Sequence, residues 1–152
     1  MSENAHRERH SGRWLLLVPA IIVLALVVNG VDPSADRAKL YFLDEGRTKL
    51  VSERRAMPLV GPVEERAEQV LKELLLGPFN YRLQPLFLQD ARLGPVMHRG
   101  GRLIVELEIA DLSKVDVPFA LLRSAIEKTL AASVPGYGRL ELYLNGSQAF
   151  SR

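Results

Sequence analysis

The chain has 152 residues, no cysteine, and 20 Lys and Arg against 18 Asp and Glu. The absence of cysteine excludes a disulfide framework, a thiolate metal site, a cysteine nucleophile and a lipid-modified cysteine within this sequence. Charges of both signs are interleaved and form no basic stripe, which argues against binding to nucleic acid.

A long apolar run stands near the N-terminus. Residues 14–28 carry no charge, and Arg7, Arg9 and Arg13 precede them. Extended to residue 31, the run has 18 residues, just above the length of the shortest helix that spans a bilayer, about 17 residues. The arginines favour a cytoplasmic N-terminus. We therefore predict a cytoplasmic tail at residues 1–13, a transmembrane signal anchor at 14–31 in contact with membrane lipid, a linker at 32–37 and an extracytoplasmic domain at 38–152.

Two other interpretations of the run stay open. A cleaved signal peptide has an apolar region of about 7–15 residues, and Val28 and Gly30 fit the small residues that precede a cleavage site. A buried core helix fits less well, because the run has no polar face. Both the signal anchor and the cleaved signal peptide would carry the domain across the bacterial cell membrane. The signal anchor, which we prefer, would also keep the chain in that membrane as a single-pass protein.

The domain opens with two predicted strands. Residues 39–43 are apolar and aromatic, residues 44–46 form a turn, and residues 50–57 return as the second strand of a hairpin. The centre of the second strand is Ser52-Glu53-Arg54-Arg55. This polarity predicts an edge strand with a solvated face, so we expect proline at Glu53 to be tolerated.

The rest of the domain alternates between helical and strand periodicity. Apolar residues recur with a helical period over residues 63–75, between Pro62 and Gly77-Pro78. A second helical stripe contains Phe119, Leu122, Ile126, Leu130 and Val134. Strands are predicted at 96–99 and 102–109 around a Gly-Gly turn, at 139–145, and in a short piece at 148–150. Residues 79–90 are predicted as an irregular connection.

This order, β-β-α-β-β-α-β, predicts an α/β (α+β) fold. Two helices with one apolar face each, and strands with one apolar face, pack as a two-layer sandwich. We expect a single mixed sheet with both amphipathic helices on one face, preceded by one transmembrane helix. Leu71 and Ile126 lie in the middle of the two helical stripes, and we expect them in the core.

Several short motifs in this order resemble the GerMN domain, the sporulation and spore germination family. The similar segments are the opening hairpin LYFLDEGRTKLVSERRAM, the helix end at residues 74–78, Pro85-Leu86, residues 110–113, Val134-Pro135-Gly136 and Leu144-Asn145-Gly146. The resemblance covers about residues 38–148, and residues 114–117 are shorter than the matching stretch in the family. It implies a membrane-anchored or secreted bacterial envelope domain without catalytic residues.

No group of residues in the domain predicts catalysis or a metal site. His98 is its only histidine, and Asp44-Glu45 with Glu106 or Glu108 would form a glycosidase pair only if the fold brought them together. His6 and His10 lie in the predicted tail. We interpret these residues as turn, tail and surface residues, and we expect no cofactor, no metal and no enzyme activity.

The expected function is therefore binding. We predict a membrane-anchored, non-enzymatic envelope protein whose domain binds another envelope protein or itself, with an interaction surface of Glu53, Arg54, Arg55, Glu141 and Tyr143. The alternative is an accessory or enzyme that binds or remodels the cell wall. An enzyme needs a cleft with converging titratable groups, whereas a binding domain needs an apolar patch or a free strand edge.

Overall fold

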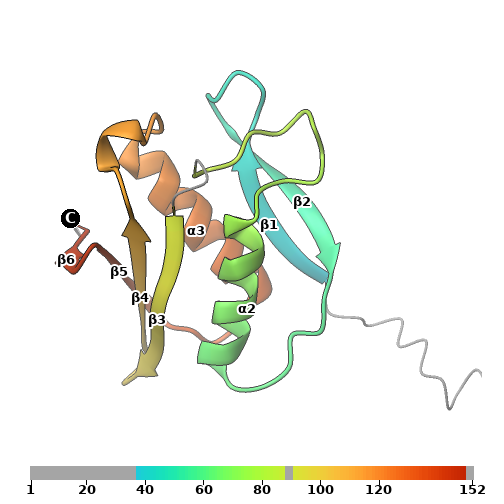
Figure 1. Ribbon diagram of the computed structural model, residues 1–152. Helices are drawn as coiled ribbons and strands as arrows, with labels where there is room; N and C mark the ends of the chain where they lie inside the picture. Colours follow the sequence, from blue (N-terminus) through green and yellow to red (C-terminus); the bar gives the residue numbers. More distant parts are fainter. Residues whose placement is uncertain (1–36, 88–90, 150–152) are drawn as a thin grey trace, which may run out of the picture. The chain divides into compact units, whose positions relative to one another are not determined.

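The computed structural model of the chain describes residues 37–87 and 91–149 (Figure 1). They belong to a compact unit, Ala35–Arg152. The predicted tail, the anchor at 14–31 and most of the linker lie outside the described residues. Among the helices that are described, none is long and apolar enough to cross a membrane.

The elements follow the predicted order, and the largest shift is at β3, which begins at Ala91 instead of residue 96. They are β1 (Arg37–Leu43), β2 (Leu50–Ala56), α2 (Val63–Leu75), β3 (Ala91–Arg99), β4 (Arg102–Ile109), the 3-10 turn η1 (Leu112–Lys114), α3 (Phe119–Ser133), β5 (Arg139–Leu144) and β6 (Ser147–Gln148). The mixed α+β class, both hairpins and both long helices are confirmed. Phe119 is an exception within α3, because it is 36% exposed at the first turn rather than buried on the stripe.

The prediction of one mixed sheet was wrong. Among the named strands of the described residues, β1 and β2 pair with each other, and Leu43 of β1 adds an isolated bridge to Gln84, while β3, β4, β5 and β6 form a separate four-stranded sheet in that order. β4 and β5 run parallel, and the other neighbours are antiparallel. α2 contacts β1, β3 and α3, and α3 packs along β1. Both helices therefore lie between the hairpin β1–β2 and the larger sheet, as Figure 1 shows, instead of covering one face of a continuous sheet.

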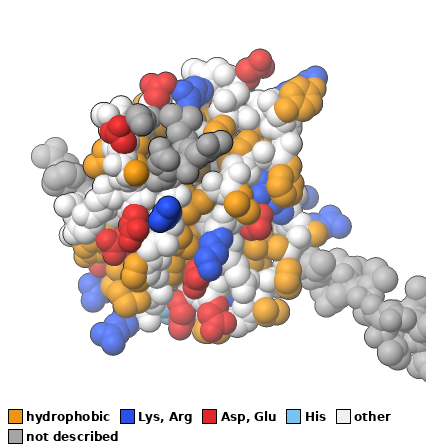
Figure 2. All heavy atoms as spheres, in the orientation of Figure 1, with side chains coloured by type: hydrophobic (Ala, Val, Ile, Leu, Met, Phe, Trp, Pro, Cys, Tyr) orange, Lys and Arg blue, Asp and Glu red, His pale blue; other side chains and the backbone are white. Residues whose placement is uncertain are grey.

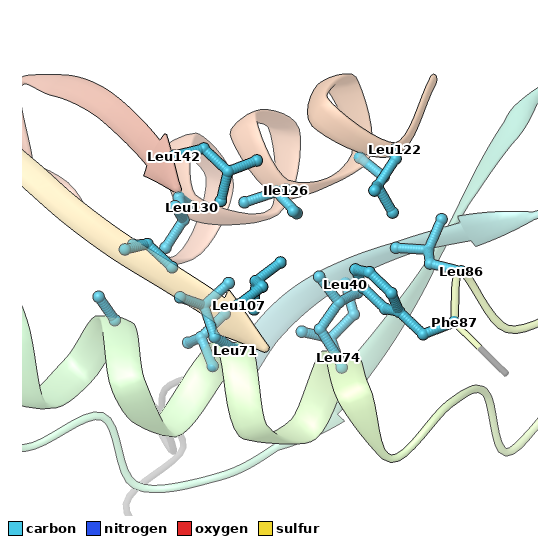
Figure 3. Packing of buried hydrophobic residues seen from close by; sticks show 14 of the residues in the cluster. Leu40, Leu71, Leu74, Leu86, Phe87, Leu107, Leu122, Ile126, Leu130 and Leu142 are labelled. Atoms are coloured by element: carbon cyan, nitrogen blue, oxygen red, sulfur yellow. The ribbon is translucent and has the colours of Figure 1, made fainter. Parts of the chain in front are cut away.

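One hydrophobic core joins both sheets and both helices. Leu40 of β1, Leu71 and Leu74 of α2, Leu107 of β4 and Ile126 of α3 are at most 1% exposed, and their side chains converge in Figure 3. The expected burial of Leu71 and Ile126 is confirmed. Each helix buries its apolar stripe because strands from two sheets supply apolar side chains around it.

Side chains of α3 close one edge of the first hairpin. The Tyr41 backbone N–H donates to Thr129 Oγ1 at 3.0 Å, and the Lys39 N–H donates to Ser133 Oγ at 2.8 Å. Ser133 Oγ also donates to the Lys39 carbonyl at 3.2 Å. Thr129 and Ser133 are buried. Their hydroxyl groups satisfy backbone groups that a third strand would otherwise satisfy, so β1 needs no strand neighbour on this side.

Two short sequence motifs position the larger sheet. Gly138 has φ +74°, and a Cβ atom there would lie only 2.0 Å from the Gly101 carbonyl oxygen, so only glycine allows β5 to begin beside the β3–β4 turn. At the other end, the Asn145 side chain accepts from the Ile109 N–H at 2.7 Å and donates to the Ile109 carbonyl at 2.8 Å. Asn145 thus extends the β4–β5 pairing by one residue with its side-chain amide.

Candidate interaction surface

The five predicted surface residues do not form one surface. Glu53, Arg54 and Arg55 lie on β2, whereas Glu141 and Tyr143 lie on β5 of the other sheet. Arg54 is exposed, but Arg55 is 5% exposed and belongs to the interior. β2 does have one solvated face, but the predicted surface position of Arg55 was wrong, because side chains alternate along a strand and only Ser52 and Arg54 of this segment face outward.

Arg55 is the centre of a buried polar cluster. Its guanidinium contacts the Glu53 carboxylate at 2.8 Å and the Glu73 carboxylate on α2 at 2.9 Å. It also donates to the main-chain carbonyls of Glu73 and Gly77. The Phe79 ring covers it, with 3.7 Å from Cζ to the ring centroid. The guanidinium therefore has partners on several sides, as a buried charge requires.

Glu53 connects the same cluster to the loop after α2. Its carboxylate accepts from the Phe79 N–H at 3.1 Å and from the Asn80 N–H at 3.0 Å. Burial alone would raise the pKa of Glu53, but the Asn80 N–H, the Arg55 side chain and the Phe79 N–H together lower it. The carboxylate therefore stays charged and holds the loop against β2.

We call residues 76–82, held in this way, the aromatic loop. Its apolar side chains point largely into solvent: Leu76 is 75% exposed, Phe79 78% and Tyr81 84%. The loop is also braced internally, since Asn80 Oδ1 accepts from the Arg82 N–H at 3.0 Å. Large exposed aromatic side chains on a fixed backbone are typical of protein-binding surfaces, because little conformational entropy is lost on binding.

The outer edge of β2 is the second binding feature. Three residues of β1 are the cross-strand partners of Arg55, Glu53 and Val51, namely Ala38, Leu40 and Phe42. The β1 residues that alternate with them direct their N–H groups away from β2, toward α3 and Gln84. The intervening residues of β2, Ser52, Arg54 and Ala56, therefore direct their N–H and C=O groups away from β1. Within the described residues these groups have no backbone partner. The predicted edge strand is confirmed.

Glu141 and Tyr143 have a structural environment of their own. Arg102 of β4 donates to the Glu141 carboxylate at 3.1 Å, and the Glu141 side chain is 16% exposed. Tyr143 pairs with Glu106 on one side and Gln148 on the other. These two residues belong to the larger sheet, and no hydrogen bond or ion pair among the described residues joins them to β2.

The candidate catalytic residues stay apart. Asp44 is a turn residue: its carboxylate accepts from the N–H groups of Lys49 and Thr48, and the Lys49 bond is the main cause that lowers its pKa. Glu106 and Glu108 lie on β4 of the other sheet, and His98 lies on β3. In the described part of the chain, no group of three His, Asp or Glu residues could hold a metal ion.

Phe79 and Tyr81 were not predicted as surface residues, because residues 79–90 were predicted as an irregular connection. Two aromatic side chains in a loop that follows Gly77-Pro78 were the available signal. Their exposure depends on the Glu53–Arg55 cluster, whose members are 18 to 27 residues apart from their loop and helix partners. No local pattern reports such a contact.

Known proteins resemble this chain both in sequence pattern and in fold. The sequence model of the family "Sporulation and spore germination" (Germane) matches residues 39–150. The first GerMN domain of the sporulation protein GerM from Bacillus subtilis is similar in structure, with TM-score 0.50 and 16% identity over 74% of this chain and 84% of that one. No curated protein matches the sequence.

Two further structures are similar. The tandem GerMN domains of the same Bacillus subtilis protein give TM-score 0.46 and 14% identity, covering 74% of this chain and 40% of that one. A presumed lipoprotein from Clostridium perfringens gives TM-score 0.45 and 18% identity, covering 73% and 75%. At these identities the likeness concerns the fold alone.

Proposed function

The chain belongs to the sporulation and spore germination family, and from that premise we propose that it is a membrane-anchored, non-enzymatic bacterial envelope protein. Its GerMN domain binds another envelope protein or a second copy of itself. The apolar run at residues 14–31 supports the anchor, and the arginines before it support an extracytoplasmic domain.

The free edge of β2 beside the aromatic loop is the observation that carries the binding proposal. A partner strand that pairs with Ser52, Arg54 and Ala56 would satisfy their backbone groups, as in other cases of strand addition. The loop is tied to the same strand through Glu53, so Phe79 and Tyr81 are available to anchor the side chains of that partner.

The register also indicates at which residue of β2 a proline would block this edge. Proline at Glu53, expected from sequence to be tolerated, would remove an N–H that faces Leu40 and a carboxylate that holds the loop. Proline at Ser52 removes only an N–H on the outer edge, where proline is tolerated. Ser52→Pro is therefore the appropriate variant, and Glu53→Pro is its destabilised counterpart.

The test is photo-crosslinking of the full chain in its native membrane. A photoreactive residue at Ala56, exposed at the outer edge of β2, should give a discrete protein adduct. The same residue at Lys128, exposed on α3, is the matched control and should give none. Ser52→Pro and Tyr81→Ala should each weaken the Ala56 adduct without changing the melting temperature.

Two outcomes would contradict the proposal. Equal adducts from Ala56 and Lys128, or an Ala56 adduct that Ser52→Pro leaves intact, would show that the edge is not the binding surface. Absence of adducts together with co-sedimentation of the protein with purified peptidoglycan would favour the cell-wall alternative instead.

A further inference from the structure

The hairpin β1–β2 has one face toward the core and one face away from it. Ala38, Leu40 and Phe42 are 0% exposed, so the alternate residues of β1 face the opposite way. That outer face contains Arg37, Lys39 and, from β2, Arg54. We call these three cations the basic face; Arg37 and Arg54 are exposed and Lys39 is half-buried.

Two of these cations are directly opposed across the hairpin. Lys39 is the cross-strand partner of Arg54, and Arg37 lies two residues before Lys39 on the same face. Like charges in directly opposite positions destabilise a pair of strands. Within residues 37–87 and 91–149, none of the three has a carboxylate partner: the ion pairs of Glu53 lie on the other face.

The basic face also has an aromatic member. Tyr41 lies on this face two residues after Lys39 on β1, and Lys39 Nζ is 5.3 Å from the centre of the Tyr41 ring. Tyrosine beside lysine and arginine is a combination found where proteins meet the headgroup layer of a membrane. On the face drawn in Figure 2, Lys and Arg side chains lie among Asp and Glu side chains.

The position of the basic face in the chain restricts what it can meet. Arg37 is the last residue of the predicted linker, which has six residues after the predicted anchor. A fully extended segment of this length spans at most about 20 Å. A basic face at the end of so short a tether is held close to the bilayer, where the local concentration of headgroups is high.

From this position and this charge we infer that the basic face docks on anionic phospholipid headgroups of the same membrane. The inference rests on the proposed anchor and adds the ligand class of the membrane-facing surface. Anionic headgroups relieve the repulsion between Lys39 and Arg54 that the fold leaves uncompensated. Each cation near an anionic surface strengthens adsorption about fivefold, so the three together act about a hundredfold.

The chain suits a direct test because it contains no cysteine, so one introduced cysteine carries a single fluorophore. Ser52 is exposed and faces Tyr41 on this side of the hairpin. Full-length Ser52→Cys, labelled and reconstituted in vesicles with a headgroup-attached quencher, should be quenched at least threefold more strongly in phosphatidylglycerol than in phosphatidylcholine. Salt at 0.5 M should remove most of that difference, as it screens exposed charges (roughly 4–5 Å Debye length).

Charge-reversal variants supply the matched comparison. Lys39→Glu/Arg54→Glu should abolish the lipid dependence of quenching, whereas Arg92→Glu/Arg99→Glu on exposed positions of β3 should preserve it. Both variants should melt within a few degrees of the unaltered chain, because all four side chains are outside the core.

The outcomes separate this inference from the anchor. A chain that floats with vesicles but is quenched equally in both lipids, or a charge reversal on β1 and β2 that changes nothing, overturns the inference and leaves the anchor standing. A full-length chain that fails to float with vesicles overturns both.

Discussion

The hairpin β3–β4 buries a row of apolar side chains, whereas the hairpin β1–β2 buries a charged cluster on part of its inner face. On β4, Leu103, Val105 and Leu107 are at most 1% exposed and alternate with more exposed residues. On β2, the inward positions 53 and 55 hold Glu53 and Arg55. The hairpin β1–β2 therefore depends on polar partners outside itself, whereas the hairpin β3–β4 depends on apolar packing.

The two hairpins also differ in what satisfies the backbone groups at the second edge of β4 and of β1. β4 continues the sheet by pairing with β5. β1 instead offers its second edge to the hydroxyl groups of Thr129 and Ser133 on α3. Apolar packing tolerates many neighbours of suitable volume, whereas hydrogen bonds and ion pairs demand specific ones. The first hairpin should accordingly be far more sensitive to single polar substitutions.

The largest expected effect comes from breaking the buried cluster. Arg55→Met should lower the free energy of unfolding by about 3–5 kcal/mol, because it leaves the Glu53 carboxylate and the carbonyls of Glu73 and Gly77 without their cation. Arg102→Met in the second hairpin removes an ion pair with Glu141 in which Arg102 is 55% exposed, and should cost at most about 1 kcal/mol. Urea titration measures both, and equal losses would refute the contrast between the hairpins.

A smaller effect should follow from removing one hydroxyl group behind β1. Thr129→Val keeps the volume of the side chain but leaves the Tyr41 N–H without its acceptor, which should cost about 1–3 kcal/mol. Lys128→Ala, the exposed neighbour on α3, should change the unfolding free energy by less than about 0.5 kcal/mol. Faster amide exchange at Tyr41 in Thr129→Val would locate the loss at this edge; unchanged exchange would contradict it.

The most modest effect concerns pH. The folded-state pKa of Glu53 lies below its ordinary value of 4.5, so its contribution to stability is complete above that value. The contribution is lost as the pH falls below 4.5 toward the lowered pKa, because the unfolded chain binds the proton first. Glu53→Gln should therefore flatten the stability profile in this window. Glu108→Gln, at an exposed position of β4, should preserve the steeper profile. A flat profile in Glu108→Gln together with a steep one in Glu53→Gln would show that Glu53 does not cause this pH dependence.

One expectation for the helices changes for the same reason. From the sequence alone, Glu73 and Lys128 lie off the apolar stripes of their helices, which predicts two surface residues whose replacement by alanine costs little. Lys128 is exposed, but Glu73 contacts Arg55 with its carboxylate and its carbonyl. Its position on the polar side of α2 was correct, yet the polar side of α2 meets β2, so this glutamate is a structural partner.

The candidate site shows where prediction from sequence ends. The polar centre of β2 did indicate an edge strand, and the register confirms that Ser52 and Arg54 face outward. The same polarity misled for Glu53 and Arg55, because a charged side chain reads as solvated unless its partner is known. The exposure of Phe79 and Tyr81 was missed because residues 79–90 follow no regular period, so nothing local to them indicates which of their side chains are exposed.

The sequence by itself determined the order of helices and strands, both turns of the hairpins, the edge position of β2 and membership of the family. These features depend on local periodicity, on turn residues such as Gly100-Gly101 and on short motifs in order. Only the tertiary structure decided that there are two sheets, that Thr129 and Ser133 close β1, and that Arg55 ties α2 and the aromatic loop to β2. Those contacts join residues 18 to 94 positions apart. They depend on which polar groups the packed core brings within hydrogen-bonding distance, and no local pattern along the chain contains that information.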